Sequence, residues 1–177
     1  MAESAQWGAP QSAGVIVVAG NPRPGSRTLA LATMVADGIA NVTGVRRRLD
    51  VDLAVMAGRL FDPDDPGVDD LLRVVARSQI AVIASPTYKA SYTGLLKAFL
   101  DRYGDQGLGS CIAVPLMTGG SRDHALAVDL ALRPLLVELG AVVPTTSLFI
   151  SMPEYETREA LVEQWIERNR DVLCRLA

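Results

Sequence analysis

The sequence has few of the residues that build metal sites or covalent cross-links. Its 177 residues include two cysteines and one histidine, too few for a disulfide framework or a zinc site. Free thiols are typical of a reducing compartment, so we expect a cytoplasmic protein. No apolar run approaches the ~18 residues of a membrane span, and the first residues lack the pattern of a signal peptide. We therefore expect neither a membrane protein nor a secreted one.

Basic residues are not in surplus either. Seventeen basic and twenty acidic residues give a net charge of −3, which argues against a nucleic-acid partner held by bulk charge. Hydrophobic residues make up 49% and charged residues 21% of the chain, as is typical of a folded globular protein. We expect a disordered or extended leader over residues 1–13 and one domain over residues 14–177.

Patterns of buried strands alternate with amphipathic helices along the chain. We expect strands over residues 14–19, 49–55, 80–84, 110–117 and 142–150, and helices over residues 28–40, 68–78, 93–103, 121–139 and 157–176. Alternating strands and helices predict a parallel sheet with helices on both faces. Five strands fit the flavodoxin-like order 2-1-3-4-5, which makes a three-layer α/β sandwich.

In such a sheet a ligand binds beyond the carboxyl ends of the strands, near the point where the strand order reverses. The loop after the first strand, Gly20–Thr28, runs into a helix whose first amides favour an anion. It lacks the lysine of a Walker A loop and the GxGxxG pattern, so a single terminal phosphate fits better than a pyrophosphate. The alternative is a plain turn with Ser26 as the helix N-cap.

Two other loops lie at the same predicted edge. The loop Ser85–Gly94 carries two tyrosines, several hydroxyl groups and one of the two lysines of the chain, which suits a flat and partly solvated ligand. The loop Thr118–Ser121 has two glycines before a helix, so its backbone can approach a ligand closely. Ordinary surface turns are the alternative for both.

Together the three loops resemble those of the NADPH-dependent FMN reductase family. The matching strings are GNPRPGSRT (Gly20–Thr28), SPTYKASYTGLLK (Ser85–Lys97) and PLMTGGSRDHALAVDLALRPLLVELGA (Pro115–Ala141), within a resemblance over roughly residues 14 to 150. The chain is most similar to the branch that supplies reduced FMN to two-component monooxygenases, such as the alkanesulfonate type. Asn21 departs from the family, which commonly has serine after the glycine, but the backbone there can still donate.

The resemblance implies FMN as cofactor and NADPH or NADH as electron donor. Hydride would pass from nicotinamide C4 to flavin N5, so neither a catalytic side chain nor a metal is expected. The implied FMN-binding residues are Asn21, Arg23, Ser26, Arg27 and Thr28 in the first loop (phosphate), Pro86, Thr87, Tyr88 and Lys89 in the second (isoalloxazine), and Thr118, Gly119 and Gly120 in the third (N1/O2 edge). The alternatives are a flavin-dependent reductase of quinones, azo dyes or metal oxyanions, and a flavodoxin-type electron carrier without nicotinamide turnover.

The resemblance also implies a homodimer or homotetramer and a possible monooxygenase partner. We expect helix 93–103 in the subunit interface, because its apolar stripe is wider than one sheet contact requires. The stripe consists of Leu95, Leu96, Phe99, Leu100 and Tyr103. The alternative is that this helix is buried within its own chain.

One position bears on how the flavin is used. Some members of the two-component branch have an aromatic residue midway along the helix after the fourth strand, associated with a π-bulge and with flavin that exchanges as a substrate. The corresponding residue here is Leu130, a good helix former without a ring. We therefore expect a regular helix and tightly held FMN that is reduced and reoxidised in ping-pong fashion. The alternative is that Leu130 only fills the core.

Overall fold

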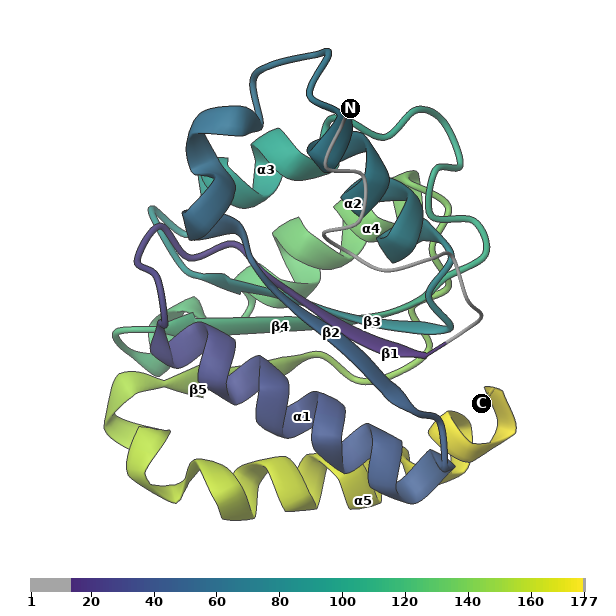
Figure 1. Cartoon of the computed structure of the whole chain (residues 1–177). Coiled ribbons are helices and arrows are strands. Elements are labelled where there is room, and N and C mark those ends of the chain that lie inside the picture. Colours follow the sequence, from purple (N-terminus) through teal and green to yellow (C-terminus); the bar gives the residue numbers. More distant parts are fainter. Residues whose placement is uncertain (1–13, 177) are drawn as a thin grey trace.

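A computed structural model describes residues 14–176, so the expected leader over residues 1–13 lies outside the described residues. Five parallel strands form one sheet in the order β2-β1-β3-β4-β5 (Figure 1). The strands are β1 (Val15–Ala19), β2 (Arg47–Asp52), β3 (Ile80–Pro86), β4 (Ile112–Gly119) and β5 (Leu148–Ser151). The predicted α/β class and strand order are therefore confirmed.

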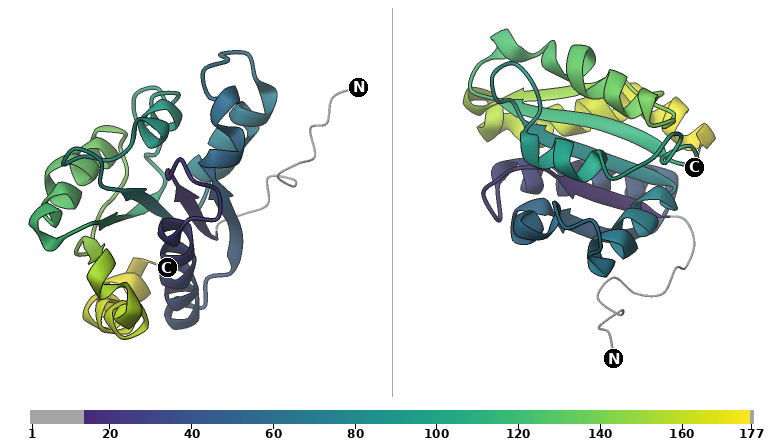
Figure 2. Two further views of the ribbon diagram at one scale, coloured as in Figure 1. Left: turned by 90° about the vertical axis from the view of Figure 1, so that its left-hand side faces the viewer. Right: turned by 90° about the horizontal axis from the view of Figure 1, so that it is seen from above.

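Helices cover both faces of this sheet. Figure 1 shows α1 and α5 on one face and α2, α3 and α4 on the other. Their bounds are α1 (Arg27–Thr43), α2 (Pro66–Ala76), α3 (Gly94–Leu100), α4 (Arg133–Glu138) and α5 (Arg158–Leu176). Short 3₁₀ segments are η1 (Leu53–Arg59), η2 (Arg122–His124) and η4 (Met152–Thr157), and η3 (Val128–Leu132) is a π-helical turn. The left view of Figure 2 looks onto the carboxyl ends of the strands, where the connecting loops gather.

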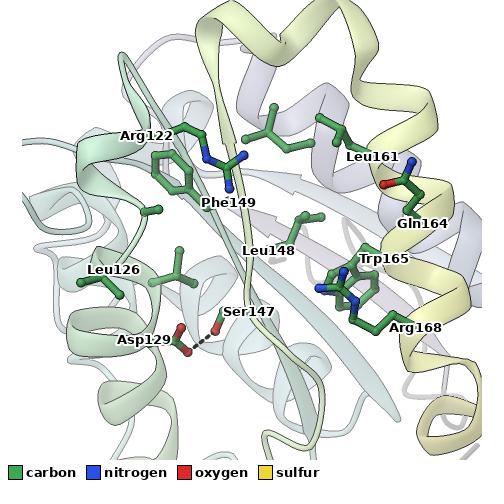
Figure 3. A pocket seen from close by; sticks show the side chains of 13 residues that line it. Arg122, Leu126, Asp129, Ser147, Leu148, Phe149, Leu161, Gln164, Trp165 and Arg168 are labelled. Carbon is green, nitrogen blue, oxygen red and sulfur yellow. Dashed lines mark hydrogen bonds between the residues drawn. The ribbon is translucent and has the colours of Figure 1, made fainter.

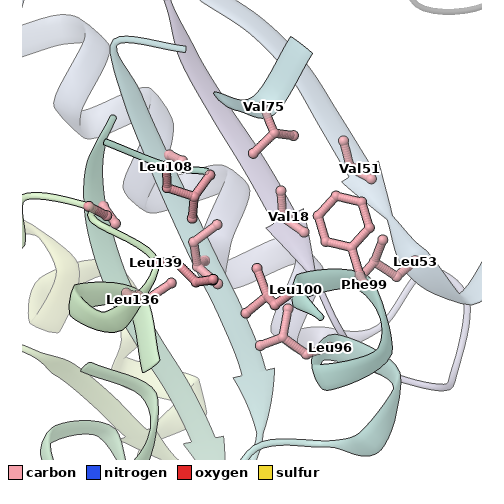
Figure 4. Close-up of a cluster of buried hydrophobic side chains, with 14 of the residues drawn as sticks. Val18, Val51, Leu53, Val75, Leu96, Phe99, Leu100, Leu108, Leu136 and Leu139 are labelled. Atoms are coloured by element: carbon pink, nitrogen blue, oxygen red, sulfur yellow. The ribbon is translucent and has the colours of Figure 1, made fainter. Parts of the chain in front are cut away.

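Alternating strand residues divide the core into two layers, because successive side chains of a strand point to opposite faces. Val15 and Val17 pack with α1 and α5, whereas Ile16 and Val18 pack with residues of α2, α3 and α4. Figure 4 shows part of the second layer, in which Val18 lies close to Phe99. Helices pack against both faces of the sheet, so the ends of the strands are left to form a ligand site.

The stripe on α3 belongs to this core. Leu96, Phe99 and Leu100 are fully buried within the chain, and Leu95 and Tyr103 pack against the same cluster. The stripe is wide because the helix lies over the sheet and beside η1. The expected interface role of this helix thus loses its basis, and the alternative of burial within the chain accounts for the pattern.

The helix predicted over residues 121–139 is interrupted. The Arg133 amide donates to the Val128 carbonyl oxygen, five residues back, which defines the π turn of η3. The expectation of a regular helix at Leu130 is therefore wrong. Pro134 follows directly and has no N–H for the Leu130 carbonyl, so a regular helix would lose that hydrogen bond in any case. Leu130 is 74% exposed, so it does not fill the core either.

The last predicted strand is also shorter than expected. Val142 makes only an isolated bridge to Ile112, and β5 begins at Leu148. The Arg133 side chain holds the intervening segment, because its guanidinium donates to the carbonyl oxygens of Val143 at 2.9 Å and Thr145 at 2.7 Å. These carbonyls bond to a side chain instead of a neighbouring strand.

Candidate functional site

A cavity of about 610 Å³ lies at the carboxyl ends of β1, β3 and β4. Its lining consists of Asn21, Arg23, Pro24, Gly25, Ser26, Arg27, Thr28, Pro86, Thr87, Tyr88, Thr118, Gly119, Gly120 and Met152. The structure thus brings together all of the predicted site residues except Lys89. Met152, at the start of η4, joins them from a segment that the sequence did not single out.

The amino end of α1 forms one wall of this cavity. Ser26 is the N-cap, and its hydroxyl accepts a hydrogen bond from the Leu29 amide at 3.2 Å. The next amides, those of Arg27 and Thr28, belong to the first turn, where a helix has no internal acceptors. Because α1 is 17 residues long, its dipole adds a partial positive charge at this end. The wall is suited to an anion.

The loop before α1 takes its shape from a glycine and an aspartate. Gly25 has φ +62°, a left-handed conformation that side chains other than glycine adopt only with strain. Its amide donates to Asp52 Oδ2 at 2.8 Å, and Asp52 Oδ1 accepts from the Ala54 amide at 3.1 Å. The sequence analysis missed Asp52. The predicted strand over residues 49–55 placed Asp52 in its interior, whereas β2 ends at Asp52 and so brings this side chain to the edge at which the three loops meet.

Buried polar side chains join the first and third loops beneath the cavity. Asn21 Nδ2 donates to Thr28 Oγ1 at 3.1 Å, and Thr28 Oγ1 lies 2.8 Å from Thr118 Oγ1. All three residues are buried. Asn21 Oδ1 also accepts from the Arg23 amide at 3.0 Å. These side chains therefore have partners within the protein and fix the position of the loops, whereas contact with FMN stays a prediction.

The second loop contains a tight two-residue turn. The amide and carbonyl groups of Tyr88 and Ser91 bond to each other, at 2.8 and 3.1 Å. Lys89 and Ala90 between them have φ values of 51° and 62°, as a type I′ turn requires, although such turns favour glycine and asparagine. Lys89 is exposed at the tip, outside the cavity lining. Its predicted contact with the isoalloxazine gains no support from this placement.

The third loop has two glycines with different surroundings. A Cβ on Gly119 would lie 2.6 Å from Phe149 Cζ, so this glycine makes room for a ring from β5. A Cβ on Gly120 would meet nothing within 4 Å. Only Gly120 thus has the open backbone that the sequence analysis expected of both residues.

A polar atom without a partner lies in the cavity wall. The Thr87 amide donates to the Thr118 carbonyl at 2.6 Å, which fixes the backbone at this point. The Thr87 hydroxyl oxygen is buried and has no hydrogen-bond partner among residues 14–176. An unpaired buried hydroxyl costs about 1–3 kcal/mol, so a ligand with a polar edge would stabilise the site.

Ionisable side chains of the cavity are limited to two arginines and a tyrosine, Arg23, Arg27 and Tyr88. Among residues 14–176, no histidine or carboxylate lines the cavity. Cys111 lies elsewhere, and burial raises the pKa of its thiol, which keeps it uncharged. No group of three or more potential metal ligands occurs among the described residues.

A second pocket, of about 340 Å³, lies beside β5, one of the two edge strands of the sheet. Figure 3 shows Leu126 and Asp129 on one side of it and Gln164 and Arg168 of α5 on the other. Arg122 forms an ion pair with Glu154 at the start of η4. None of the predicted site residues lines this pocket.

Within residues 14–176, no helix is long and apolar enough to cross a membrane.

Residues 14–154 match the family model "NADPH-dependent FMN reductase". Curated relatives include an "FMN reductase (NADPH)" of Escherichia coli K12, 33% identical over 72% of this chain and 67% of that protein. The "NADH-dependent FMN reductase SfnF" of Pseudomonas putida is 31% identical over 90% of this chain and 88% of that protein. A match to another P. putida "FMN reductase (NADPH)", 36% identical, spans 62% of this chain and 58% of that protein.

Solved structures resemble the whole domain. An NADH:FMN oxidoreductase (EMOB, apo form) superposes with a TM-score of 0.81 and 27% identity over 91% of this chain and 90% of that one. An oxidoreductase of Corynebacterium diphtheriae gives a TM-score of 0.80 and 26% identity over 94% of this chain and 97% of that one.

Proposed function

This chain belongs to the NADPH-dependent FMN reductase family of oxidoreductases, and we propose that it reduces FMN with NADPH or NADH at the cavity of the three loops. The observation that carries the proposal is the meeting of these loops around the amino end of α1, with the unpartnered Thr87 hydroxyl in the wall. A helix N-terminus suits a phosphate. A buried hydroxyl without a partner suits the polar edge of a flavin ring.

The residues of the cavity fit FMN by their chemistry. The amides at the start of α1, with the Ser26 hydroxyl and the guanidinium groups of Arg23 and Arg27, would bind its phosphate. Pro86, Thr87 and Tyr88 would border its ring system, and the open backbone of Gly120 would face the ring edge that gains negative charge on reduction. Bound FMN supplies the hydride acceptor, its N5 atom. The protein binds and orients the flavin and provides no acid or base.

The electron donor and acceptor are further parts of the proposal. Relatives named for NADPH and relatives named for NADH both match this chain, so both donors are candidates. The resemblance to the two-component branch favours delivery of reduced FMN to a monooxygenase. A reductase of quinones, azo dyes or metal oxyanions is the rival, and a cytoplasmic location stays a prediction.

We also propose self-association into a dimer or tetramer, now through a different surface. Leu126 just before η3, Leu130 in η3 and Val137 in α4 are 66%, 74% and 55% exposed. Exposed apolar side chains in one region mark interaction surfaces. Light scattering at micromolar concentration tests this, and a mass near the 18.9 kDa of one chain would contradict it.

Steady-state oxidation of NADPH and NADH tests the function. Each donor is mixed with protein and with either free FMN or FMN plus a quinone, and oxidation is followed at the nicotinamide absorbance. Rapid oxidation with free FMN as acceptor supports the proposal. Oxidation that needs the quinone favours the rival enzyme. Absence of oxidation by a protein that binds FMN would indicate an electron carrier and contradict the proposal.

A further inference from the structure

The segment that joins β5 to α5 borders the cavity beside the first loop. Figure 1 shows it beside the start of α1. Met152 of this segment lines the cavity, and Arg27 Nη1 lies 3.5 Å from the Met152 sulfur. The Tyr155 hydroxyl donates to the Arg27 carbonyl oxygen at 3.3 Å. The segment therefore contacts both the side chain and the backbone of a predicted phosphate ligand.

The Tyr155 ring lies against two guanidinium groups. Arg27 Cζ is 5.5 Å and Arg158 Cζ is 4.6 Å from the ring centroid, within the ~6 Å range of a cation–π contact. No carboxylate among residues 14–176 forms an ion pair with Arg27. Arg27 is thus held by a neutral ring and a thioether, which orient the guanidinium and leave its charge available to an anion.

Tyr155 is itself fixed by the segment around it. The Glu154 carboxylate accepts from the Ser151 amide at 3.1 Å and hydroxyl at 2.6 Å, and it pairs with Arg122 from the loop after β4. Arg158 Nη1 donates to the Tyr155 carbonyl oxygen at 2.9 Å. The backbone that carries the ring is therefore held on both sides of Tyr155, so the ring can restrict where the Arg27 guanidinium lies.

We propose that Tyr155 is a positioning residue that directs Arg27 toward the flavin phosphate and so strengthens the preference for FMN over riboflavin. The inference rests on the proposed function, because it takes the cavity to be the FMN site. It adds a specificity determinant that touches no part of the flavin itself. Its effect falls on the phosphate alone, since the ring system would be bound by the other two loops.

The test measures the dissociation constants of FMN and riboflavin by quenching of flavin fluorescence. Tyr155→Leu removes the ring face and should weaken FMN about two- to fivefold, the range of an exposed cation–π contact. Riboflavin affinity should stay within the error of the measurement. Tyr155→Phe is the matched control, because it keeps the ring and loses only a long hydroxyl contact, and it should bind both flavins as the parent does.

A double-mutant cycle shows whether Tyr155 acts through Arg27. Arg27→Ala alone should weaken FMN about 10- to 100-fold, the range for a charged hydrogen bond. In that background Tyr155→Leu should have no further effect on FMN. Tyr155→Met, which keeps apolar bulk, gives a second test if the leucine variant folds poorly.

Three outcomes would overturn the inference. They are equal weakening of FMN and riboflavin by Tyr155→Leu, a Tyr155→Phe variant as weak as the leucine variant, and additive effects in the cycle. Failure of the proposed function is recognised separately, because the parent protein would then not oxidise NADPH or NADH with FMN as acceptor, whether or not it binds FMN.

Discussion

Gly25→Ala perturbs the first loop with a single methyl group. Gly25 has φ +62°, and an added Cβ would meet nothing within 4 Å. Steric overlap with other parts of the protein is therefore absent, and the cost comes from the backbone conformation alone. The native loop geometry is also held by the hydrogen bond that the Gly25 amide donates to Asp52 Oδ2.

The expected magnitude follows from two opposing contributions. The left-handed conformation costs a residue with a Cβ ~1–2 kcal/mol, and the stiffer unfolded chain returns ~0.4–1 kcal/mol. The net loss of about 1 kcal/mol corresponds to a melting temperature ~2–4 °C lower for a domain of this size. If the free protein instead relaxes its loop, the same free energy appears as up to about fivefold weaker FMN binding.

The assay combines thermal unfolding, followed by circular dichroism, with FMN titration. Gly94→Ala is the matched control, because a Cβ there also meets nothing within 4 Å and the residue is not among those with positive φ. It should leave both stability and affinity unchanged or raise stability slightly. A Gly25→Ala protein that melts and binds FMN like the parent would refute the reasoning.

Three other results are expected. Ala90 has φ 62°, a conformation that strains alanine and not glycine, so Ala90→Gly should raise the melting temperature by ~2–4 °C. An unchanged melting temperature would contradict strain in this turn. The expectation of tightly held FMN rested on a regular helix at Leu130, and the π turn of η3 reverses it, because the resemblance associates that feature with exchangeable flavin. FMN should therefore separate from the protein on gel filtration in flavin-free buffer, with micromolar affinity, about −8 kcal/mol; a yellow protein peak would contradict this. The Ser151 hydroxyl, and next the Arg122 guanidinium, hold the pKa of Glu154 below its ordinary 4.5. The parent protein should therefore be more stable than Glu154→Gln by its full margin above pH 4.5, and this margin should shrink as the pH falls below 4.5. A difference in the free energy of urea unfolding that does not change with pH would count against the contact.

Local pattern was enough for the sheet and for most of the cavity lining. β-branched runs and helical stripes specify parallel strands and covering helices, and the strand order then places the loops after β1, β3 and β4 at one edge. The cavity lining at Ser26, Thr87 and Gly120 follows from that topology. Lys89 is the exception, because a turn with two positive φ values directs it to solvent.

Features that depend on distant partners could not be read from local pattern. The apolar stripe of α3 looks the same whether a core or a second subunit covers it, and only packing against the sheet decides for Leu96 and Phe99. The residues around Leu130 have high helix propensity and favour a regular helix. The π turn forms instead, where Pro134 has no amide to donate and the Arg133 guanidinium bonds to the segment before β5.

The sequence by itself determined the fold class, the strand order and the three loops of the site, because these depend on periodicity and on turn residues close together in the chain. Tertiary structure alone decided that Asp52 holds the first loop and that Tyr155 lies against Arg27, 128 residues away along the chain. Such contacts have no local signature. They arise because parallel strands end at a common edge, which brings the residues after each strand together regardless of their separation in sequence.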